Sequence, residues 1–512
     1  MLTIFKPLIL LLFALGVDQF AYSSILQKHD SVNFFSTGKH TKTDTLRDSV
    51  SVINFGAKGD EITNDFEAIQ EAINYIALKN GGIVFFPKGT YLIEGKNNGL
   101  TDGLNISSSN ITLKGEGSNS IIKQGSSSFY TLSINNNNTG TSNIKDNVKN
   151  IKISCFRFTC DIKTFGFSEF KHMLNINAAS DVEISGCSFE GFRGDGILIG
   201  SGNIEGIERH NENISITDCL FDGINNDNRN GVSVIDVNGL LINRCLFRHV
   251  TRPNMPGAID IEPDNSYHVV KNIVIQNNKF DSIGGNSAAI SYNGNSKIKQ
   301  QIKNLEVINN QITNGLNTGS AFSFQTKRNP TASTPPNNII VKYNTVKNYY
   351  QSVQVFGIKN ILFQSNIFDS TIRNGVIGFT DNSTQKNNDV RLYDNTFINN
   401  GYKAHAGLSL FSGDNIELKN NIFQDCGSVL DPAPKAIEFK GNWYGKILLD
   451  NNTSRNSRTK SSINIKRESN NMDVVIKNFF FQNKLILGII ILMQAFLIRS
   501  GIKKRQMMKT SF

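Results

Sequence analysis

The chain has 512 residues, of which 39% are hydrophobic and 19% charged, and its formal net charge is +10. Twelve lysines and arginines against three acids give the segment 450–512 a charge of +9, so the rest of the chain is nearly neutral. This distribution argues against a nucleic-acid-binding groove and favours a basic tail beside a membrane.

The N-terminus has the pattern of a secretory signal peptide. Lys6 precedes an apolar core at 8–17, and Ala21-Tyr22-Ser23 supplies small residues for cleavage, which predicts a signal peptide over 1–23. The apolar core is about half of the roughly 20 residues that span a bilayer, so it does not fit a membrane anchor. We expect export to an extracellular, cell-surface or periplasmic location, with residues 24–49 as a polar linker.

The segment 51–95 contains the first organised elements. Asn64 and Glu67 have the spacing of a capping box, and Phe66, Ile69, Ile73 and Ile76 fall on one helical face. The pattern predicts a helix that ends near residues 80–82, followed by a buried strand over 83–86.

From residue 110 onward the sequence repeats. Ten segments share the pattern Asn/Asp-apolar-x-apolar, and they close on Ile184, Ile216, Ile242, Ile275, Val307, Val341, Phe363, Leu392, Leu418 and Phe439. Three residues after each of these anchors stands Cys187, Cys219, Cys245, Asn278, Asn310, Asn344, Asn366, Asn395, Asn421 or Asn442. Five residues after the anchor the side chain is apolar, most often Phe. Two columns in register over ten segments indicate stacked coils of one solenoid.

These columns predict an all-β fold, a right-handed parallel β-helix over 50–449, with the helix at 66–76 as an N-terminal cap. Coils in such a fold stack about 4.8 Å apart. Inward asparagines satisfy backbone groups at the bend, and the phenylalanines stack in the core. The three cysteines of the column are expected to be inert buried thiols. Because neighbouring coils lie within disulfide reach, a disulfide bridge between two of them is the alternative.

The N-terminal elements carry a family resemblance. Asn54-Phe55-Gly56-Ala57-Lys58-Gly59-Asp60, the helix, and the stretch from Gly81 to Tyr91 resemble the entry motif of pectate-lyase-like β-helix proteins, which include polygalacturonases and rhamnogalacturonases. With the repeats, the resemblance covers about 50–444. It implies the fold and an action on polysaccharide.

The C-terminal segment differs in composition from the repeats. Residues 450–478 are polar and basic, which predicts a linker, and 479–498 are mostly apolar, with Lys484 near one end. We expect 479–498 to form a C-terminal transmembrane helix rather than a packed terminal helix, with the basic tail 499–512 in the cytoplasm.

A second strand follows the anchored one in several coils. Alternation places its intervening residues outward, and only one coil presents two carboxylates side by side, Asp260 and Glu262. Asp195 precedes an equivalent strand two coils earlier. The surrounding outward or turn positions expected to bind a substrate are Arg229, Asn230, Ser233, Arg252, Ser291, Asn293 and Gln325.

Paired carboxylates suit glycoside hydrolysis. Their side chains can lie at either of the separations that retaining and inverting enzymes use, and proximity raises one pKa so that an acid stands beside a base. The main hypothesis is a hydrolase with Asp260, Glu262 and Asp195 as catalytic groups and no required cofactor. The alternative for these acids is an ordinary solvated strand.

Two other functions use the same face. In a calcium-dependent polyuronate lyase, Asp236, Asp260 and Glu262 would bind calcium, and Arg229 or Arg252 would remove the proton. In a non-catalytic polysaccharide-binding protein, outward Tyr292, Phe356, Phe379 and Phe411 would serve as aromatic platforms.

The resemblance to polygalacturonases does not extend to their catalytic set. Gly194-Asp195-Gly196 resembles a fragment of their first motif, but Arg229-Asn230-Gly231 stands where they have paired aspartates, and no Gly-His-Gly occurs. The sequence therefore predicts the fold and a polysaccharide partner, while hydrolase, lyase and binding protein stay open.

Overall fold

The structure is a computed structural model. It describes residues 48–481, except for 95–102, 127–129, 136–140, 202–205, 285–287, 295–301, 316–318, 327–335, 378–386, 405, 412, 429, 432–433, 440–444, 456–461, 466–471 and 479. The predicted signal peptide and the cytoplasmic tail lie outside these residues. Residues 48–481 fall within one compact unit, which begins at Arg47.

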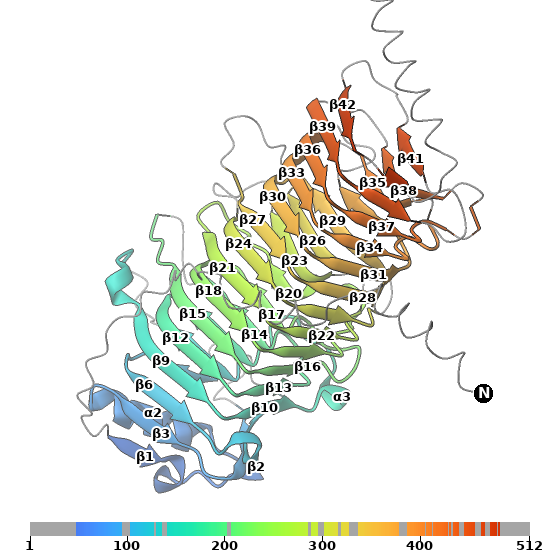
Figure 1. Ribbon diagram of the computed structural model, residues 1–512. Helices are drawn as coiled ribbons and strands as arrows, with labels where there is room; N and C mark the ends of the chain where they lie inside the picture. Colours follow the sequence, from blue (N-terminus) through green and yellow to red (C-terminus); the bar gives the residue numbers. More distant parts are fainter. Residues whose placement is uncertain are drawn as a thin grey trace, which may run out of the picture. The chain divides into compact units, whose positions relative to one another are not determined.

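Three parallel sheets run along this unit, two with 15 strands and one with 13 among the described residues, and most coils contribute one strand to each sheet (Figure 1). Sheet A begins each coil. It contains β1 (Ser49–Ser51), β3 (Gly82–Phe85), β6 (Ile111–Lys114), β9 (Val148–Ser154), β12 (Ala179–Ser185), β15 (Asn211–Thr217), β18 (Val237–Asn243), β21 (Val270–Gln276), β24 (Lys303–Ile308), β27 (Ile339–Lys342), β30 (Lys359–Gln364), β33 (Asn387–Tyr393), β36 (Gly413–Lys419), β39 (Gly445–Asp450) and β42 (Met472–Lys477).

Sheet B follows sheet A in each coil after a sharp bend. It contains β2 (Asp60–Asn64), β4 (Gly89–Ile93), β7 (Ser120–Gln124), β10 (Arg157–Cys160), β13 (Ser188–Glu190), β16 (Leu220–Asp222), β19 (Leu246–Arg248), β22 (Lys279–Asp281), β25 (Gln311–Thr313), β28 (Thr345–Tyr349), β31 (Ile367–Thr371), β34 (Thr396–Ile398), β37 (Ile422–Gln424), β40 (Thr453–Arg455) and β43 (Phe480–Phe481).

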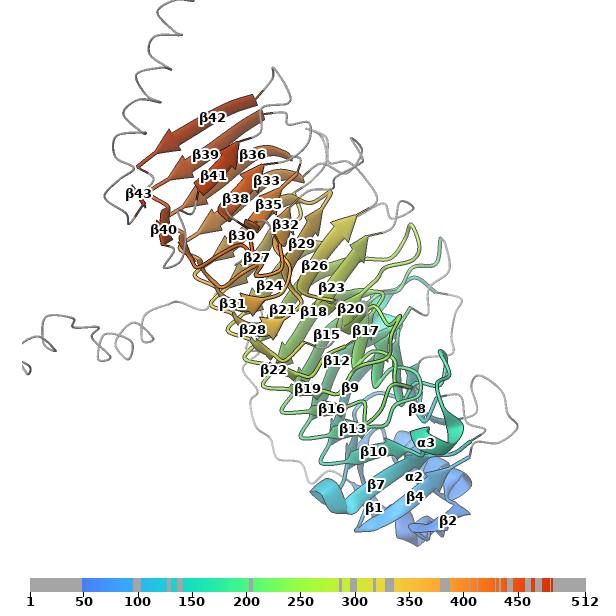
Figure 2. The same ribbon diagram turned by 90° about the vertical axis from the view of Figure 1, so that its right-hand side faces the viewer.

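Sheet C completes each coil. It contains β5 (Leu104–Ile106), β8 (Leu132–Asn135), β11 (Leu174–Asn177), β14 (Ile197–Ile199), β17 (Val232–Val234), β20 (Gly257–Ile261), β23 (Ala288–Gly294), β26 (Ser320–Thr326), β29 (Gln351–Phe356), β32 (Gly375–Ile377), β35 (Ala406–Leu410), β38 (Lys435–Phe439) and β41 (Ser462–Ile465). The view in Figure 2 shows how the strands of successive coils lie over one another. The predicted right-handed parallel β-helix is confirmed.

The anchors of the repeat are the inward residues of sheet A. Ile184, Ile216, Ile242 and Ile275 pair with one another in consecutive strands, and the series continues to Leu418. The next anchor is Leu449 on β39, which pairs with Leu418. The predicted anchor Phe439 is wrong, because it lies on β38 in sheet C and pairs with Leu410.

A ladder of buried asparagines runs along the bend between sheets A and B. The Nδ2 of each member except the last donates to the side-chain oxygen of the next asparagine and to a backbone carbonyl, and that of Asn452 donates to Leu418 O. The ladder contains Asn278, Asn310, Asn344, Asn366, Asn395, Asn421 and Asn452. The ladder satisfies polar groups that the bend buries, as predicted. Its last member is Asn452 rather than the predicted Asn442, since Asn452 follows the true anchor.

The aromatic column stacks inside the core. The rings of Phe158, Phe189, Phe221, Phe247 and Phe280 lie nearly parallel, with centroid separations between 4.6 and 5.1 Å. Among the described residues all six cysteines are free thiols, so no bridge joins the cysteines of the column.

The N-terminal helix α2 (Phe66–Leu78) covers the first coil. It buries Phe66, Ile69, Ile73 and Ile76 on the predicted face, and Gln70 exchanges two hydrogen bonds with the backbone of Asn105 on β5. The N-cap is Asp65 rather than Asn64; the Asp65 carboxylate accepts from Lys58 and Gly59 N–H, while Asn64 Oδ1 accepts from Phe66 N–H. An edge that would otherwise be open is thereby covered.

The β-helix extends beyond the predicted boundary at residue 449. β40, β41 and β42 pair with strands of sheets B, C and A, so much of the predicted linker 450–478 continues the coils. No helix in the described part of the chain is long and apolar enough to cross a membrane. Most of the predicted transmembrane segment 479–498 lies outside the described residues.

Candidate functional site

The chemistry predicted from the sequence lies on the outward face of sheet C. In register across neighbouring strands stand Ser233 on β17, Asp260 on β20, Ser291 on β23 and Ser323 on β26. The inward partners Ile259 and Ile261 are fully buried, which fixes the outward direction of Asp260. The strand alternation that the sequence predicted for this coil is confirmed.

Asp260 is a carboxyl group in a dry environment. It is 2% exposed, and its Oδ1 accepts a hydrogen bond from Ser291 Oγ at 2.7 Å and from Asn293 Nδ2 at 3.3 Å. Burial, followed by the charge of Glu262, raises the pKa of Asp260 to about 8, and the Ser291 bond and Arg229 only partly oppose this shift. At neutral pH Asp260 is therefore protonated and can donate a proton.

Asp195 is in the opposite electrostatic situation. It is fully buried, Arg229 Nη1 donates to both of its oxygens at 2.7 and 2.8 Å, and His172 Nδ1 lies 3.1 Å from Oδ2. Burial alone would raise the pKa of Asp195, but Arg229 and His172 outweigh it and hold the pKa at about 2. Asp195 is thus an ionised anchor for Arg229.

Arg229 connects the buried anion to the outward row. Its Nη1 also lies 3.3 Å from Ser233 Oγ, and its Nη2 lies 3.7 Å from Glu169 Oε1. In the amide orientation that satisfies both ends, Asn230 donates to Gly257 O at 2.9 Å and accepts from Ser233 and Arg229. This network fixes the guanidinium beside the coil that carries Asp260.

Arg252 has the environment of a ligand-binding cation. Its guanidinium carbon lies 3.6 Å from the centre of the Phe167 ring, and burial together with the charge of Arg229 lowers its pKa. Within the described part of the chain, the side chain of Arg252 forms no hydrogen bond or ion pair, and its backbone carbonyl accepts from Met255 N–H. Stacking therefore orients a half-buried cation and leaves its donors available.

The sequence reasoning missed the loop that supplies Phe167, Glu169 and His172. This loop follows α3 (Ile162–Phe165) and precedes β11, and Arg193 holds it through hydrogen bonds to the carbonyls of Phe165 and Gly166. Loops have no hydrophobic period, so no sequence signal places these side chains against Asp195, Arg229 and Arg252.

The predicted site residues on sheet C are less exposed than the sequence predicts. Glu262, Asn293 and Gln325 are half-buried, but loops and neighbouring side chains cover Asp195, Asn230, Ser233, Asp260 and Ser291. Strand alternation predicts which face of the sheet a residue occupies, but it does not report what lies over that face. The substrate-binding residues predicted on β23 do adjoin the acid site, since Gln325 Nε2 donates to Asn293 and Asn293 donates to Asp260.

The predicted calcium set does not assemble. Asp236 is fully buried and contacts His210, Ser201 and the backbone N–H of Val269. In the described residues no group of three His, Cys, Asp or Glu side chains is placed to hold a metal ion. Asp236 does not join Asp260 and Glu262, because the turn after β17 directs it between coils.

The predicted aromatic platforms are wrong for three of the four residues. Tyr292 is fully buried, while Phe356 is 8% and Phe411 9% exposed. Tyr292 pairs with Ile261, an inward position, and its hydroxyl accepts a hydrogen bond from Ile302 N–H. Phe379 lies outside the described residues.

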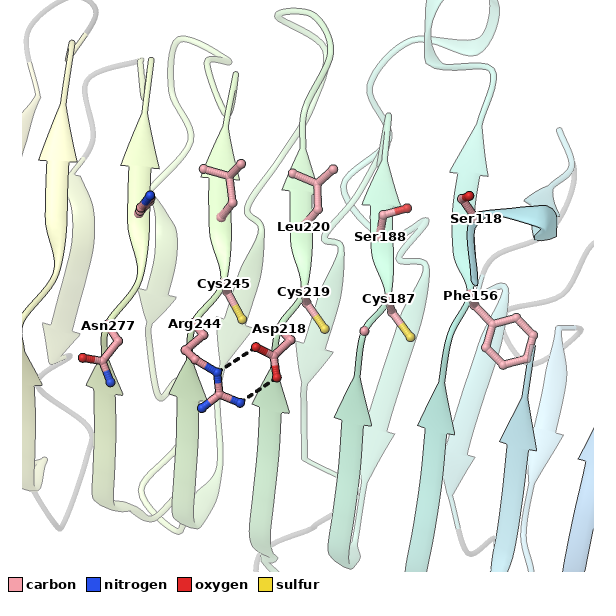
Figure 3. Close-up of a pocket in the computed structure, with 13 residues that line it drawn as sticks. Ser118, Phe156, Cys187, Ser188, Asp218, Cys219, Leu220, Arg244, Cys245 and Asn277 are labelled. Atoms are coloured by element: carbon pink, nitrogen blue, oxygen red, sulfur yellow. Dashed lines mark hydrogen bonds and ion pairs between the residues drawn. The ribbon is translucent and has the colours of Figure 1, made fainter. Parts of the chain in front are cut away.

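A surface depression of about 610 Å³ lies elsewhere, at the bend between sheets A and B (Figure 3). Its lining includes Cys187, Cys219 and Cys245, together with the ion pair of Asp218 and Arg244. The cysteines are 2–3% exposed, and neighbouring thiols and burial raise the pKa of Cys219 and Cys245. Protonated thiols are poor nucleophiles, so this depression carries no comparable chemistry.

Comparison with known proteins supports the sequence-based resemblance. Residues 49–280 match the family described as rhamnogalacturonase A/epimerase, pectate lyase-like. A curated relative, alginate lyase 7 of Azotobacter vinelandii, is 42% identical over 67 residues, which are 13% of this chain and 8% of that protein.

Two solved structures share the fold. The A-module of a mannuronan C-5 epimerase from Azotobacter vinelandii has a TM-score of 0.58 at 14% identity, with 85% of this chain and 99% of that chain covered. The pre-mature gene product 12 of bacteriophage phi29 has a TM-score of 0.61 at 16% identity, with 85% of this chain and 56% of that chain covered. The chain is therefore a right-handed parallel β-helix, and its residues 49–280 match the family described as rhamnogalacturonase A/epimerase, pectate lyase-like.

Proposed function

We propose that the protein is an exported polysaccharide-cleaving enzyme, a glycoside hydrolase whose active centre lies on sheet C around Asp260 and Glu262. The observation that carries this proposal is the position of Asp260, which is 2% exposed on the outward face of sheet C, two residues before Glu262. Burial and the neighbouring Glu262 raise its pKa to about 8. A carboxylic acid that keeps its proton at neutral pH beside a second carboxyl group is what glycosidic cleavage requires. The signal peptide and export belong to the proposal.

In this mechanism Asp260 donates its proton to the glycosidic oxygen as the carbon–oxygen bond breaks. Glu262 either activates a water molecule or attacks the anomeric carbon, and the separation of the two carboxyl groups decides between these routes. Arg229, held by Asp195, stabilises charge that develops near Asp260. Arg252, Asn293 and Gln325, which keep some exposed surface, bind sugar hydroxyl or acidic groups. The covered Asn230, Ser233 and Ser291 hold Arg229 and Asp260 in position. No cofactor takes part.

The second candidate is a polyuronate lyase, which two observations favour. The match to alginate lyase 7 covers part of the chain, and Arg252 is a half-buried cation without a hydrogen-bonded partner in the described residues. In this reaction Arg252 and the protonated Asp260 would neutralise the substrate carboxylate, and a basic group would remove the proton on the adjacent carbon. The electron pair then forms the carbon–carbon double bond, and the glycosidic oxygen leaves and takes up a proton. No step of this reaction is routed through calcium.

A product assay separates these functions. The full-length protein is incubated with neutral and uronate polysaccharides while reducing ends and the absorbance of unsaturated uronates are recorded together. Reducing ends without new absorbance support the hydrolase, and both signals together support the lyase. Binding with neither signal would leave a non-catalytic binding protein and overturn the proposed activity.

A further inference from the structure

A second histidine–carboxylate site lies at the end of sheet C, where the chain turns into sheet A. Asp236 follows β17, and residues from three coils converge on it. Its Oδ1 accepts from Val269 N–H at 2.9 Å, Ser201 Oγ lies 3.3 Å from Oδ2, and His210 Nδ1 lies 2.8 and 3.0 Å from the two oxygens. A carboxylate with no exposed surface is costly to bury unless it is bonded in this way.

The carboxylate determines how His210 presents its ring. Because Asp236 accepts at Nδ1, the hydrogen-bond network assigns a proton to that nitrogen and leaves Nε2 as the second functional atom. The His210 side chain is 27% exposed, and within the described residues no hydrogen bond involves its Nε2. His268 behind this pair differs, since its Nδ1 accepts from Asp264 and Asn265 N–H and the residue is 3% exposed.

The site lies next to the proposed active centre. Glu262 N–H donates to the backbone oxygen of Val234 at 3.0 Å, and Val234 lies two residues before Asp236. Adjacent coils stand about 4.8 Å apart, so Glu262 borders, one coil away, the end of the strand that Asp236 follows. A saccharide that crosses β14, β17 and β20 would bring one of its hydroxyl groups to His210.

We propose that His210, oriented by Asp236, is a hydroxyl-binding subsite for the saccharide one coil before the paired acids. Asp236 is the positioning residue, because it determines which imidazole nitrogen carries the proton. The inference deepens the proposed function by giving the bound saccharide a direction across the coils. It requires binding and not cleavage, so it stands or falls independently of turnover.

The test uses full-length D260N protein with labelled histidines, so that cleavage does not interfere with binding. Oligosaccharides of alginate, polygalacturonate and laminarin are titrated separately while the imidazole nitrogen resonances are recorded. We expect the Nε2 signal of His210 to shift with at least one of them. His249 is the matched control, since its Nδ1 also lies 3.0 Å from an aspartate, Asp222, but on sheet B.

Calorimetric titration of variants completes the test. H210A should weaken binding of the oligosaccharide that shifts the His210 signal by about five- to tenfold, the usual effect of losing one hydrogen bond. H249A should leave its binding unchanged. In D236N the side-chain amide can donate to Nδ1, which moves the ring proton to Nε2. This variant should therefore weaken binding although His210 is still present. Binding that is equal in H210A and the parent, or no binding of any of the three saccharides, would overturn the proposal. If D236N does not fold, the H210A comparison still decides.

Discussion

Two aspartates on sheet C show how the surroundings of a carboxyl group determine its protonation. Asp195 has Arg229 and His172 beside it and is ionised, whereas Asp260 has mainly burial and a like charge and keeps its proton. The same residue type therefore holds a cation in one coil and can deliver a proton two coils later.

The raised pKa of Asp260 predicts how stability depends on pH. The unfolded pKa is near 4 and the folded pKa about 8, so the native state binds the extra proton, and the free energy of unfolding should fall as pH rises between these values. In D260N this loss should disappear, and the variant should be more stable than the parent above pH about 8. Urea denaturation at several pH values measures the free energy of unfolding of both proteins. Parallel pH curves for the two proteins would contradict the assigned environment.

Arg252 offers a residue-scale test of substrate binding. R252K keeps the positive charge but loses the planar group that stacks on Phe167, so we expect KM to rise about tenfold with little change in kcat. The exposed pair of Arg244 and Asp218 supplies the control R244K on a distant bend, which should leave KM unchanged. A fall in kcat alone would assign Arg252 to the chemical step instead.

At the scale of the elements, the asparagine ladder holds successive coils together. Asn310 Nδ2 donates to Ile275 O and to Asn344, and its Oδ1 accepts from both the backbone and the side chain of Asn278. N310A removes these bonds and leaves buried polar groups without partners, so it should destabilise the fold by about 2–4 kcal/mol.

The neighbouring residue provides a matched control for that measurement. Asn309 belongs to an exterior ladder, bonds Asn277, and has a φ of 53° that glycine adopts easily. N309G should therefore change the denaturation midpoint much less than N310A. Equal effects of the two substitutions would show that the buried ladder adds no special stability.

Sequence reasoning succeeded where the coil imposes a period and failed where it does not. The anchors, the asparagine column and the outward position of Asp260 repeat or alternate, so they could be predicted. Phe167, Glu169 and His172 come from one loop without a period, and their contacts with Arg252, Arg229 and Asp195 appear only in three dimensions. The anchor predicted for the β39 coil is wrong because the sequence before Phe439 on β38 matches the anchor pattern, although the true anchor is Leu449.

At the scale of the whole molecule, the stacked sheets need a covered end. Helix α2 packs Ile69, Ile73 and Ile76 over the first coil, and Gln70 bonds the outer strand β5. I69D would bury an unpaired charge under this helix, so we expect several kcal/mol of destabilisation and self-association through the exposed strand edge. Light scattering and denaturation check both effects, and E71D at an exposed position of α2 should change neither. A monomeric, fully stable I69D protein would show that α2 is not the cap.

The proposed function requires the outward face of sheet C to be catalytic. Turnover of the most readily cleaved polysaccharide is compared between the full-length parent and the double variant D260N/E262Q, with S323A as a control in the same outward row. The double variant should retain the fold and lose activity by at least about a hundredfold, as expected for removal of the acid and its partner. The S323A variant should stay near the parent rate. An unchanged rate in the folded double variant would contradict the proposed function.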